Sequence, residues 1–290
     1  MSGPKTIVMT GATNGIGRIV AASLAAQGHR LVLTARDEVK AMATRSQIRQ
    51  TAPEAAIEFV FADFTRLHAV ATAAQAIAAN YQRVDLLINN AGIHAFQQRV
   101  TEDGFPEMVS VNYLAPWLLT NILGPRLMAS RRSRVVTVAS EASRYAKEGN
   151  LRDALYDTAP FTRLGSAAIY GRTKLMNIMF SMELARRLAS AGVAVNCLDP
   201  GFNATGLGRE LPFAAPLERL LRFLRIGNPN RGAGIIARLA TDPQFENVSA
   251  GYFSVKDAAP LTPVAPANDV NEQKALWAAT QDALRMYCPE

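Results

Sequence analysis

Cysteine, long apolar runs and metal-ligand clusters are all scarce in this chain of 290 residues. Its two cysteines, Cys197 and Cys288, are too few for a disulfide framework. No apolar run is long enough to span a bilayer, and no signal-peptide pattern precedes the first strand-like segment. Nothing in the sequence suggests a metal site. We therefore expect a cytoplasmic protein without a disulfide scaffold, a metal or a membrane span.

The formal net charge is +7, and a basic protein can bind nucleic acid, an anionic membrane or a small anionic molecule. The positive residues are scattered, as in residues 131–134 and 219–225, and no nucleic-acid-binding motif accompanies them. We interpret the charge as that of a solvated surface. Neither a nucleic-acid partner nor membrane association is expected.

Short segments rich in β-forming residues alternate with Ala-rich helical segments along the chain. The expected strands are residues 5–9, 30–35, 57–61, 84–89, 134–139, 193–198 and 251–255. Strands that are apolar on both faces, each followed by a helix, indicate a parallel sheet covered on both sides. This pattern predicts an α/β fold with a doubly wound (Rossmann) sheet of seven parallel strands and helices on both faces. No segment has the composition of a linker, so residues 1–290 are expected to form a single domain.

Two of the expected helices have clear boundaries. One covers residues 16–27 and ends at Gly28. The other, at 166–190, carries apolar residues at i, i+3, i+4 and i+7 from Leu175 onward and ends at Gly192.

Three segments interrupt the alternation of strands and helices. Residues 141–165 are polar and irregular, whereas residues 202–232 interleave leucines with arginines as in a short amphipathic helix. A Pro/Ala-rich loop at 257–269 precedes a final helix at 270–286. The first two segments follow the carboxyl ends of strands, where ligands bind in such sheets, so we expect them to form the substrate region.

A glycine-rich turn lies between the first strand and the first helix. Its sequence is Thr-Gly-Ala-Thr-Asn-Gly-Ile-Gly, residues 10–17. Gly11, Gly15 and Gly17 permit a tight turn and the close approach of a pyrophosphate to backbone N–H groups, and the helix offers its positive end. Because a strand precedes the turn and a helix follows it, the segment predicts a dinucleotide site.

The end of the second strand distinguishes between the two nicotinamide cofactors. An acidic side chain there would bind the ribose hydroxyls of NAD and repel a 2′-phosphate. This chain has Ala35 followed by Arg36, whose guanidinium matches a phosphate in geometry and charge. We therefore predict NADP(H) as the cofactor. Asp37 comes next, and it can instead cap the following helix.

Tyr170 and Lys174 are four positions apart on an expected helix, so their side chains point from one face. A phenol has a pKa of about 10, and a nearby ammonium would lower it into the range useful for proton transfer. Ser140, at the end of a strand, could donate a hydrogen bond to the same substrate oxygen. Taken alone, Tyr-x-x-x-Lys also occurs on ordinary helix surfaces, so the hypothesis depends on its combination with the glycine turn.

At this point the chain resembles the short-chain dehydrogenase/reductase family over nearly its whole length. The matching segments, in order, are Thr10–Gly17, Asp63, Asn89–Gly92, Asn112, Ser140, Tyr170–Lys174 and Pro200–Thr205. The resemblance implies a catalytic tetrad of Asn112, Ser140, Tyr170 and Lys174. It also implies that the lysine holds the nicotinamide ribose and that the asparagine leaves a helix carbonyl free for a proton-relay water.

The resemblance and the glycine turn together imply a set of cofactor-binding residues. Asp63 would contact the adenine, and Thr205 would lie near the nicotinamide carboxamide. The full set is Gly11, Thr13, Asn14, Gly15, Ile16, Gly17, Arg36, Asp63, Phe64, Asn90, Ala91, Gly92, Tyr170, Lys174, Pro200, Gly201 and Thr205.

A finer resemblance is to the branch of NADP-dependent retinol dehydrogenases and protochlorophyllide-reductase-like enzymes. The gap from Ser140 to Tyr170 is 30 positions (170 minus 140), longer than in most of the wider family. Residues 249–253 and 276–277 also resemble the last strand and the carboxyl-terminal segment of that branch.

These features predict an NADP-dependent oxidoreductase that acts on a carbonyl or alcohol group of a hydrophobic small molecule, with Tyr170 as general acid and base. Two alternatives remain open: an NADP(H)-binding redox sensor with little catalysis, and a reductase of C=C or C=N bonds on the same scaffold. The family also implies a possible homodimer through the helices near 105–125 and 166–190. The segment 207–226 is either a lid, as in the family, or a peripheral membrane helix.

Three further side chains have alternative interpretations. His94 either faces the substrate cleft or is a loop histidine without a catalytic part. Tyr145 and Tyr156 either line the substrate pocket or pack the segment 141–165 onto the sheet.

Overall fold

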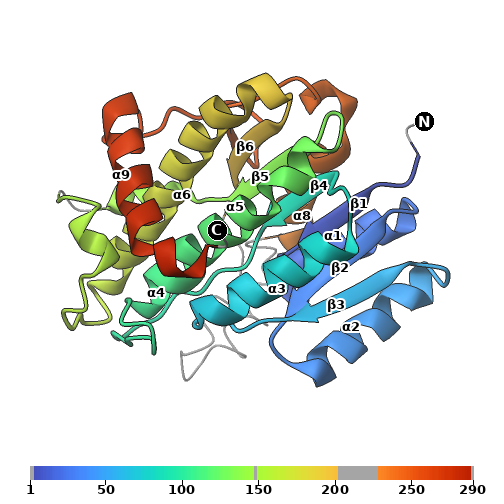
Figure 1. Cartoon of the computed structure of the whole chain (residues 1–290), viewed down its shortest axis with the longest axis horizontal. Helices are drawn as coiled ribbons and strands as arrows, with labels where there is room; N and C mark the ends of the chain where they lie inside the picture. The colour runs from blue at the N-terminus through green and yellow to red at the C-terminus, as the bar shows by residue number, and fades with distance from the viewer. Residues whose placement is uncertain (1–2, 147–148, 202–227, 289–290) are drawn as a thin grey trace.

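The computed structural model describes residues 3–146, 149–201 and 228–288, and within them all the paired strands belong to one parallel sheet. The strand order is β3-β2-β1-β4-β5-β6-β7 (Figure 1). The strands are β1 Thr6–Met9, β2 Arg30–Ala35, β3 Ile57–Phe61, β4 Leu86–Asn89, β5 Arg134–Val138, β6 Ala194–Asp199 and β7 Gly251–Ser254. The order reverses direction between β1 and β4, as expected for a doubly wound sheet. The predicted fold and its seven strands are confirmed.

Helices cover both faces of this sheet. Within the described residues the α-helices are α1 Gly15–Ala26, α2 Glu38–Thr51, α3 Leu67–Asn80, α4 Glu107–Val109, α5 Ala115–Met128, α6 Ser166–Leu188, α8 Pro229–Thr241 and α9 Val270–Ala283. One core contains residues of α3, α5, α6 and α9, and the other contains residues of α1, α2 and α8. The chain thus forms three layers, with the sheet in the middle.

Alternate residues along a strand supply the two cores. In β1, Val8 packs into the core of α3, α5 and α6, whereas Ile7 and Met9 pack into the opposite core. Because successive side chains of a strand point to opposite faces, a strand between two helical layers is expected to be apolar on both faces. This expectation explains why the strands are mostly apolar segments in the sequence.

The predicted helix boundaries agree with the structure to within a few residues. Gly28 and Gly192, predicted as end residues, have φ angles of 79° and 68°, a left-handed conformation that favours glycine. The final helix, predicted at 270–286, ends at Ala283 and is followed by a 3-10 turn, Arg285–Tyr287.

The two predicted substrate segments have different outcomes. Residues 202–227, which include Thr205 and the proposed amphipathic helix, lie outside the described residues. Residues 229–232, at the end of the predicted substrate segment 202–232, form the first turn of α8, which packs against α1. This turn belongs to the helical layer that contains α1 and α2.

The segment 141–165 packs onto the sheet through a few apolar residues. It contains two 3-10 turns, Glu141–Tyr145 and Asp153–Leu155, and it buries Leu151 and Leu155 in the core. Tyr145 and Tyr156 are more than half exposed, and neither lines the cavity described below. The ring of Tyr156 instead lies 5.4 Å from that of Phe105. The packing interpretation therefore fits Tyr156, whereas the structure supports neither interpretation for Tyr145.

Helix α9 packs alongside α6, at the left of Figure 1. Its Trp277 contacts the rings of Trp117 on α5 and Phe180 on α6, with centroids 5.1 and 5.8 Å away. The hydroxyl of Thr280 lies 2.7 Å from that of Tyr113. The homodimer stays a prediction, and it would have to use parts of α5 and α6 that α9 does not cover.

Candidate active site

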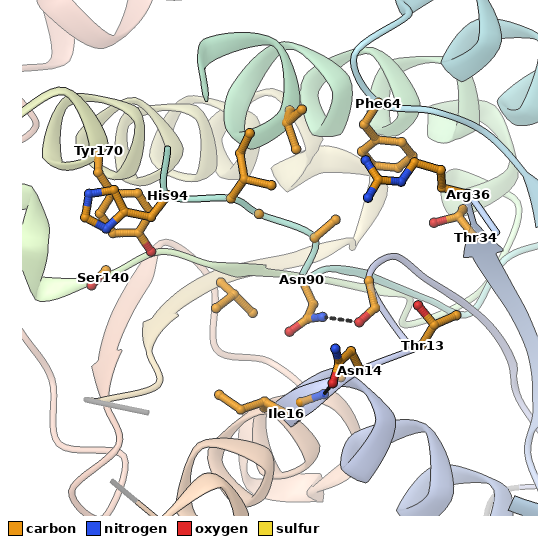
Figure 2. Close-up of a pocket in the computed structure, with 18 of the residues that line it drawn as sticks. Thr13, Asn14, Ile16, Thr34, Arg36, Phe64, Asn90, His94, Ser140 and Tyr170 are labelled. Carbon is orange, nitrogen blue, oxygen red and sulfur yellow. Dashed lines mark hydrogen bonds between the residues drawn. The ribbon is translucent and has the colours of Figure 1, made fainter. Parts of the chain in front are cut away.

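A cavity of about 450 Å³ lies at the carboxyl edge of the sheet. Figure 2 shows Tyr170, His94 and Ser140 at one end and Arg36, Thr34 and Phe64 at the other. Every predicted cofactor-binding residue within the described part of the chain lines this cavity. Their role in binding a cofactor stays a prediction, and Thr205 lies outside the described residues.

The glycine turn owes its shape to backbone conformations and a close contact. Gly11 and Gly15 have φ angles of 68° and 51°, which residues other than glycine rarely adopt. A Cβ on Gly17 would lie 2.1 Å from the carbonyl oxygen of Gly11. The side chain of Asn14 caps α1 by accepting a hydrogen bond from the Gly15 N–H at 2.7 Å. The turn therefore places the N-terminus of α1 at the cavity wall.

The loop after β4 is fastened to this turn. The Asn90 amide donates to the carbonyls of Thr10 (3.0 Å) and Gly11 (3.1 Å). The Thr10 hydroxyl oxygen accepts from the N–H groups of Asn90 and Ala91, at 3.0 and 2.9 Å. Asn90 thus also has a structural role, because its side chain fixes the turn against β4.

Arg36 lines the far end of the cavity, directly after β2. The neighbouring Asp37 caps α2, because its carboxylate accepts from the Lys40 N–H at 2.8 Å and lies 3.8 Å from the Lys40 ammonium. The capping alternative for Asp37 is confirmed. Asp63 accepts from the N–H and hydroxyl of Thr65, at 3.0 and 2.9 Å, which fixes the turn after β3.

The catalytic candidates Ser140 and Tyr170 come from two elements that pack tightly. Ser140 follows β5, and its hydroxyl oxygen accepts from the Ala142 N–H at 3.1 Å. Tyr170 lies in the second turn of α6, and the next residue, Gly171, would place a Cβ 2.5 Å from the Ala142 carbonyl oxygen. Glycine at this position therefore allows α6 to approach the turn that carries Ser140.

Lys174 is buried beneath Tyr170. Its Nζ lies 5.5 Å from the centroid of the Tyr170 ring and donates to the Val138 carbonyl at 2.9 Å. Only 3% of the residue is exposed. Burial lowers the pKa of Lys174 to about 8, although the Asp199 carboxylate acts in the opposite direction.

The expected lowering of the pKa of Tyr170 is not found. Burial raises this pKa above its ordinary value, and the Asp199 carboxylate raises it further. The sequence-based expectation considered only the charge of Lys174. In the structure, burial is the largest influence on this pKa, so Tyr170 is protonated at neutral pH.

Asn112 lies in a π-helical turn, Ser110–Leu114, between α4 and α5. Its amide donates to the Ile93 carbonyl (2.9 Å) and the Thr173 hydroxyl (3.0 Å), and its oxygen accepts from the Ile93 N–H (2.8 Å). The side chain is fully buried and does not line the cavity. Asn112 thus ties the loop after β4 to α6. Its predicted role, leaving a helix carbonyl free for a proton-relay water, stays a prediction.

Of two further residues near Tyr170, Asp199 was not assigned to the site from the sequence, and His94 was left open. Asp199, the last residue of β6, is 8% exposed and accepts from the N–H groups of Glu141 and Gly201, both at 3.1 Å. Burial raises the pKa of its carboxyl group. Its only signal in the sequence is its place just before Pro200-Gly201. His94 lines the cavity and stacks on Tyr170, with ring centroids 4.7 Å apart (Figure 2), so it does face the cleft.

The described residues contain no helix with both the length and the apolar character needed to cross a bilayer. Within the same part of the chain, no three His, Cys, Asp or Glu side chains are grouped as ligands for a metal ion.

Comparison with known proteins gives matches over most of the chain. The family model described as short chain dehydrogenase matches residues 5–213. Retinol dehydrogenase 14 of Mus musculus is 35% identical over 286 residues, which cover 94% of this chain and 84% of that protein. Polyprenol dehydrogenase of Homo sapiens is 32% identical over 256 residues, with 86% and 76% covered.

Solved structures match the fold. An uncharacterized protein from Mycobacterium paratuberculosis has a TM-score of 0.73 and 26% identity, and the match covers 97% of this chain and 93% of that one. A short chain dehydrogenase from Shigella flexneri, complexed with NADP, has a TM-score of 0.68 and 21% identity, with 87% and 97% covered.

Proposed function

Because the chain belongs to the short chain dehydrogenase family, we propose that it transfers a hydride between NADP(H) and a hydrophobic carbonyl or alcohol, with Tyr170 as general acid and base. Family membership makes the chain an oxidoreductase of alcohol or carbonyl groups. The observation that carries the finer proposal is that Ser140, Tyr170 and Lys174 line the same cavity as the glycine turn.

The glycine turn fits the pyrophosphate of a nicotinamide dinucleotide. Gly11 and Gly15 present bare backbone to the cavity, and α1 directs its N-terminus, with its backbone N–H groups, at the same wall. The cavity volume lies within the range of about 300–1,000 Å³ of small-molecule sites. A nicotinamide cofactor bound here would supply the hydride. Structures of the same fold complexed with NADP and NADPH support this assignment.

Arg36 supports NADP(H) over NAD(H). Its side chain lies at the end of the cavity remote from Tyr170 (Figure 2), where a guanidinium can pair with a 2′-phosphate. Asp37, the first acidic residue after β2, uses its carboxylate to cap α2.

Tyr170 holds the proton of the reaction at its hydroxyl group. Because burial raises its pKa, the phenol is protonated at neutral pH and can donate to the oxygen of a carbonyl substrate. The Ser140 hydroxyl can donate a second hydrogen bond to that oxygen. Lys174, charged below about pH 8, stabilises the phenolate that forms.

The substrate is proposed to be a hydrophobic aldehyde or ketone. Relatives of this chain are named for retinol and for polyprenol, both apolar alcohols. Carbonyl forms of such alcohols are the substrates to try first.

The test is oxidation of NADPH by the purified protein with retinal, decanal and a panel of ketones. We expect turnover with at least one apolar carbonyl, and loss of most of it in Tyr170→Phe. Tight NADPH binding without turnover on any carbonyl would refute the proposal and favour the redox sensor. Turnover confined to C=C or C=N compounds would favour the other alternative.

A further inference from the structure

The imidazole of His94 covers one face of the Tyr170 phenol. The two ring centroids are 4.7 Å apart, and the ring planes differ by 16°, which is a stacked arrangement (Figure 2). His94 comes from the loop after β4, whereas Tyr170 comes from α6. Asn112 joins the same two elements by its bonds to Ile93 and Thr173. The stack therefore lies between two parts of the fold that are fixed to each other.

A hydrogen bond to Ser166 fixes the orientation of the imidazole. Nε2 of His94 lies 3.1 Å from the Ser166 hydroxyl, one helical turn before Tyr170. The single proton of that hydroxyl is already donated to the Arg163 carbonyl, at 2.7 Å. Ser166 must therefore accept from His94, so Nε2 carries the proton in the neutral ring. Nδ1 is then the atom that gains a proton when the imidazole becomes charged.

This geometry couples the charge of one ring to the acidity of the other. A positive charge within about 6 Å of the face of an aromatic ring is attracted to that ring, and it favours the phenolate over the phenol. A histidine changes its charge between about pH 5 and 8. The imidazolium thus favours loss of the Tyr170 proton, whereas the neutral imidazole only packs against the ring.

We propose that His94 is a positioning residue for Tyr170: its ring holds the phenol in place, and its protonation at Nδ1 makes Tyr170 a stronger acid. The inference rests on the proposed function, since the proton that Tyr170 donates is the one used in carbonyl reduction. The carbonyl reductase is expected to become faster as pH falls through the titration of His94.

Other charged groups also face this stack. Lys174 lies 5.5 Å from the Tyr170 ring, and Asp199 on β6 raises the pKa of Tyr170. Arg163 lies over the ring of Phe96, which contacts His94.

A second pair of charges, Arg99 and Glu107, lines the same cavity with a separation of 2.5 Å. All these groups are kept when only His94 is changed. The difference between the pH profiles of the wild-type protein and a His94 variant therefore isolates the imidazole.

The test compares His94→Phe, which keeps a stacked ring without a titrating group, with His94→Ala, which removes the ring. The turnover number is measured from pH 5 to 8 with NADPH and one carbonyl compound. This compound is decanal or retinal, whichever the wild-type protein reduces faster. We expect the wild-type rate to rise as the pH falls toward 5, and we expect this rise to be absent in His94→Phe. We expect His94→Ala to be about three- to tenfold slower at pH 8, with the Kd for NADPH unchanged.

If the rate of His94→Phe rises at low pH as much as that of the wild-type protein, the charge effect is refuted. If His94→Ala has the wild-type rate at every pH, the whole inference is refuted. His68→Ala, on the exposed side of α3, is the matched control.

A stability measurement separates this inference from the proposed function. Urea unfolding of His94→Ala, Tyr170→Ala and the double variant measures the ring contact without a substrate. If the rings are coupled, the sum of the two single losses of stability exceeds the loss in the double variant. Losses that add strictly would refute the coupling. If no carbonyl is reduced, the proposed function fails while this cycle still decides whether the rings are coupled.

Discussion

Lys174 donates to the carbonyl of Val138 at 2.9 Å and so joins α6 to the end of β5 directly beneath Tyr170. This bond keeps the ammonium buried, and burial lowers the pKa of Lys174 to about 8. A lysine on the surface would keep its charge to about pH 10.4. The charge that supports Tyr170 is therefore present at neutral pH and lost in mild alkali.

The first prediction concerns pH. Because Lys174 loses its proton as pH rises through about 8, the rate of carbonyl reduction at saturating NADPH should fall above that pH. Arginine stays charged at all these pH values. Lys174→Arg should therefore be slower at every pH, but its rate should not fall in alkali. A wild-type rate that stays level up to about pH 10.4 would show that the charge of Lys174 is not needed.

The second prediction concerns cofactor choice. Arg36→Asp replaces a cation with an anion where a 2′-phosphate is proposed, so the ratio of kcat/KM for NADPH to that for NADH should fall by at least about tenfold. Arg49→Asp, on the exposed side of α2, is the control and should leave the ratio unchanged. A wild-type preference for NADH would contradict the assignment of NADP(H).

The third prediction concerns the glycine turn. In Gly17→Ala the new Cβ would lie 2.1 Å from the Gly11 carbonyl oxygen, which should lower the free energy of unfolding by about 1–3 kcal/mol and weaken NADPH binding. Gly234→Ala, in α8, meets nothing within 4 Å and should stabilise the protein by about 0.5–1 kcal/mol. Urea unfolding and NADPH fluorescence measure both effects, and equal behaviour of the two variants would contradict the close contact.

The fourth prediction concerns α9. Trp277 is 5% exposed and packs on Trp117 and Phe180, so Trp277→Ala should lower the free energy of unfolding by about 3–5 kcal/mol. Met286→Ala, at a residue that is 82% exposed, should change it by less than about 0.5 kcal/mol. If both variants unfold at the same urea concentration, α9 does not contribute to the core.

The fold was predictable because the central strands are largely apolar on both faces. Ile7, Val8 and Met9 supply two cores from one strand, and a continuous apolar segment of this kind is visible in the sequence. The glycine turn was predictable for a similar reason, since Gly11 and Gly17 stand where other side chains would be strained or would collide. In both cases a local pattern is enough to indicate the structure.

The properties that depend on three-dimensional surroundings were not predictable. The pKa of Tyr170 is raised by burial, which no spacing of residues reveals. Asn112 directs its amide to Ile93 and Thr173 and away from the cavity. The stack of His94 on Tyr170 joins residues 76 positions apart (170 minus 94).

In the proposed function, Tyr170 supplies the proton for NADPH-dependent carbonyl reduction. The most direct test measures kcat/KM for the best carbonyl substrate and the Kd for NADPH in the wild-type protein and in Tyr170→Phe. The account predicts a loss of kcat/KM of at least about 100-fold, with the Kd for NADPH almost unchanged. A Tyr170→Phe protein that reduces the carbonyl at the wild-type rate would contradict it.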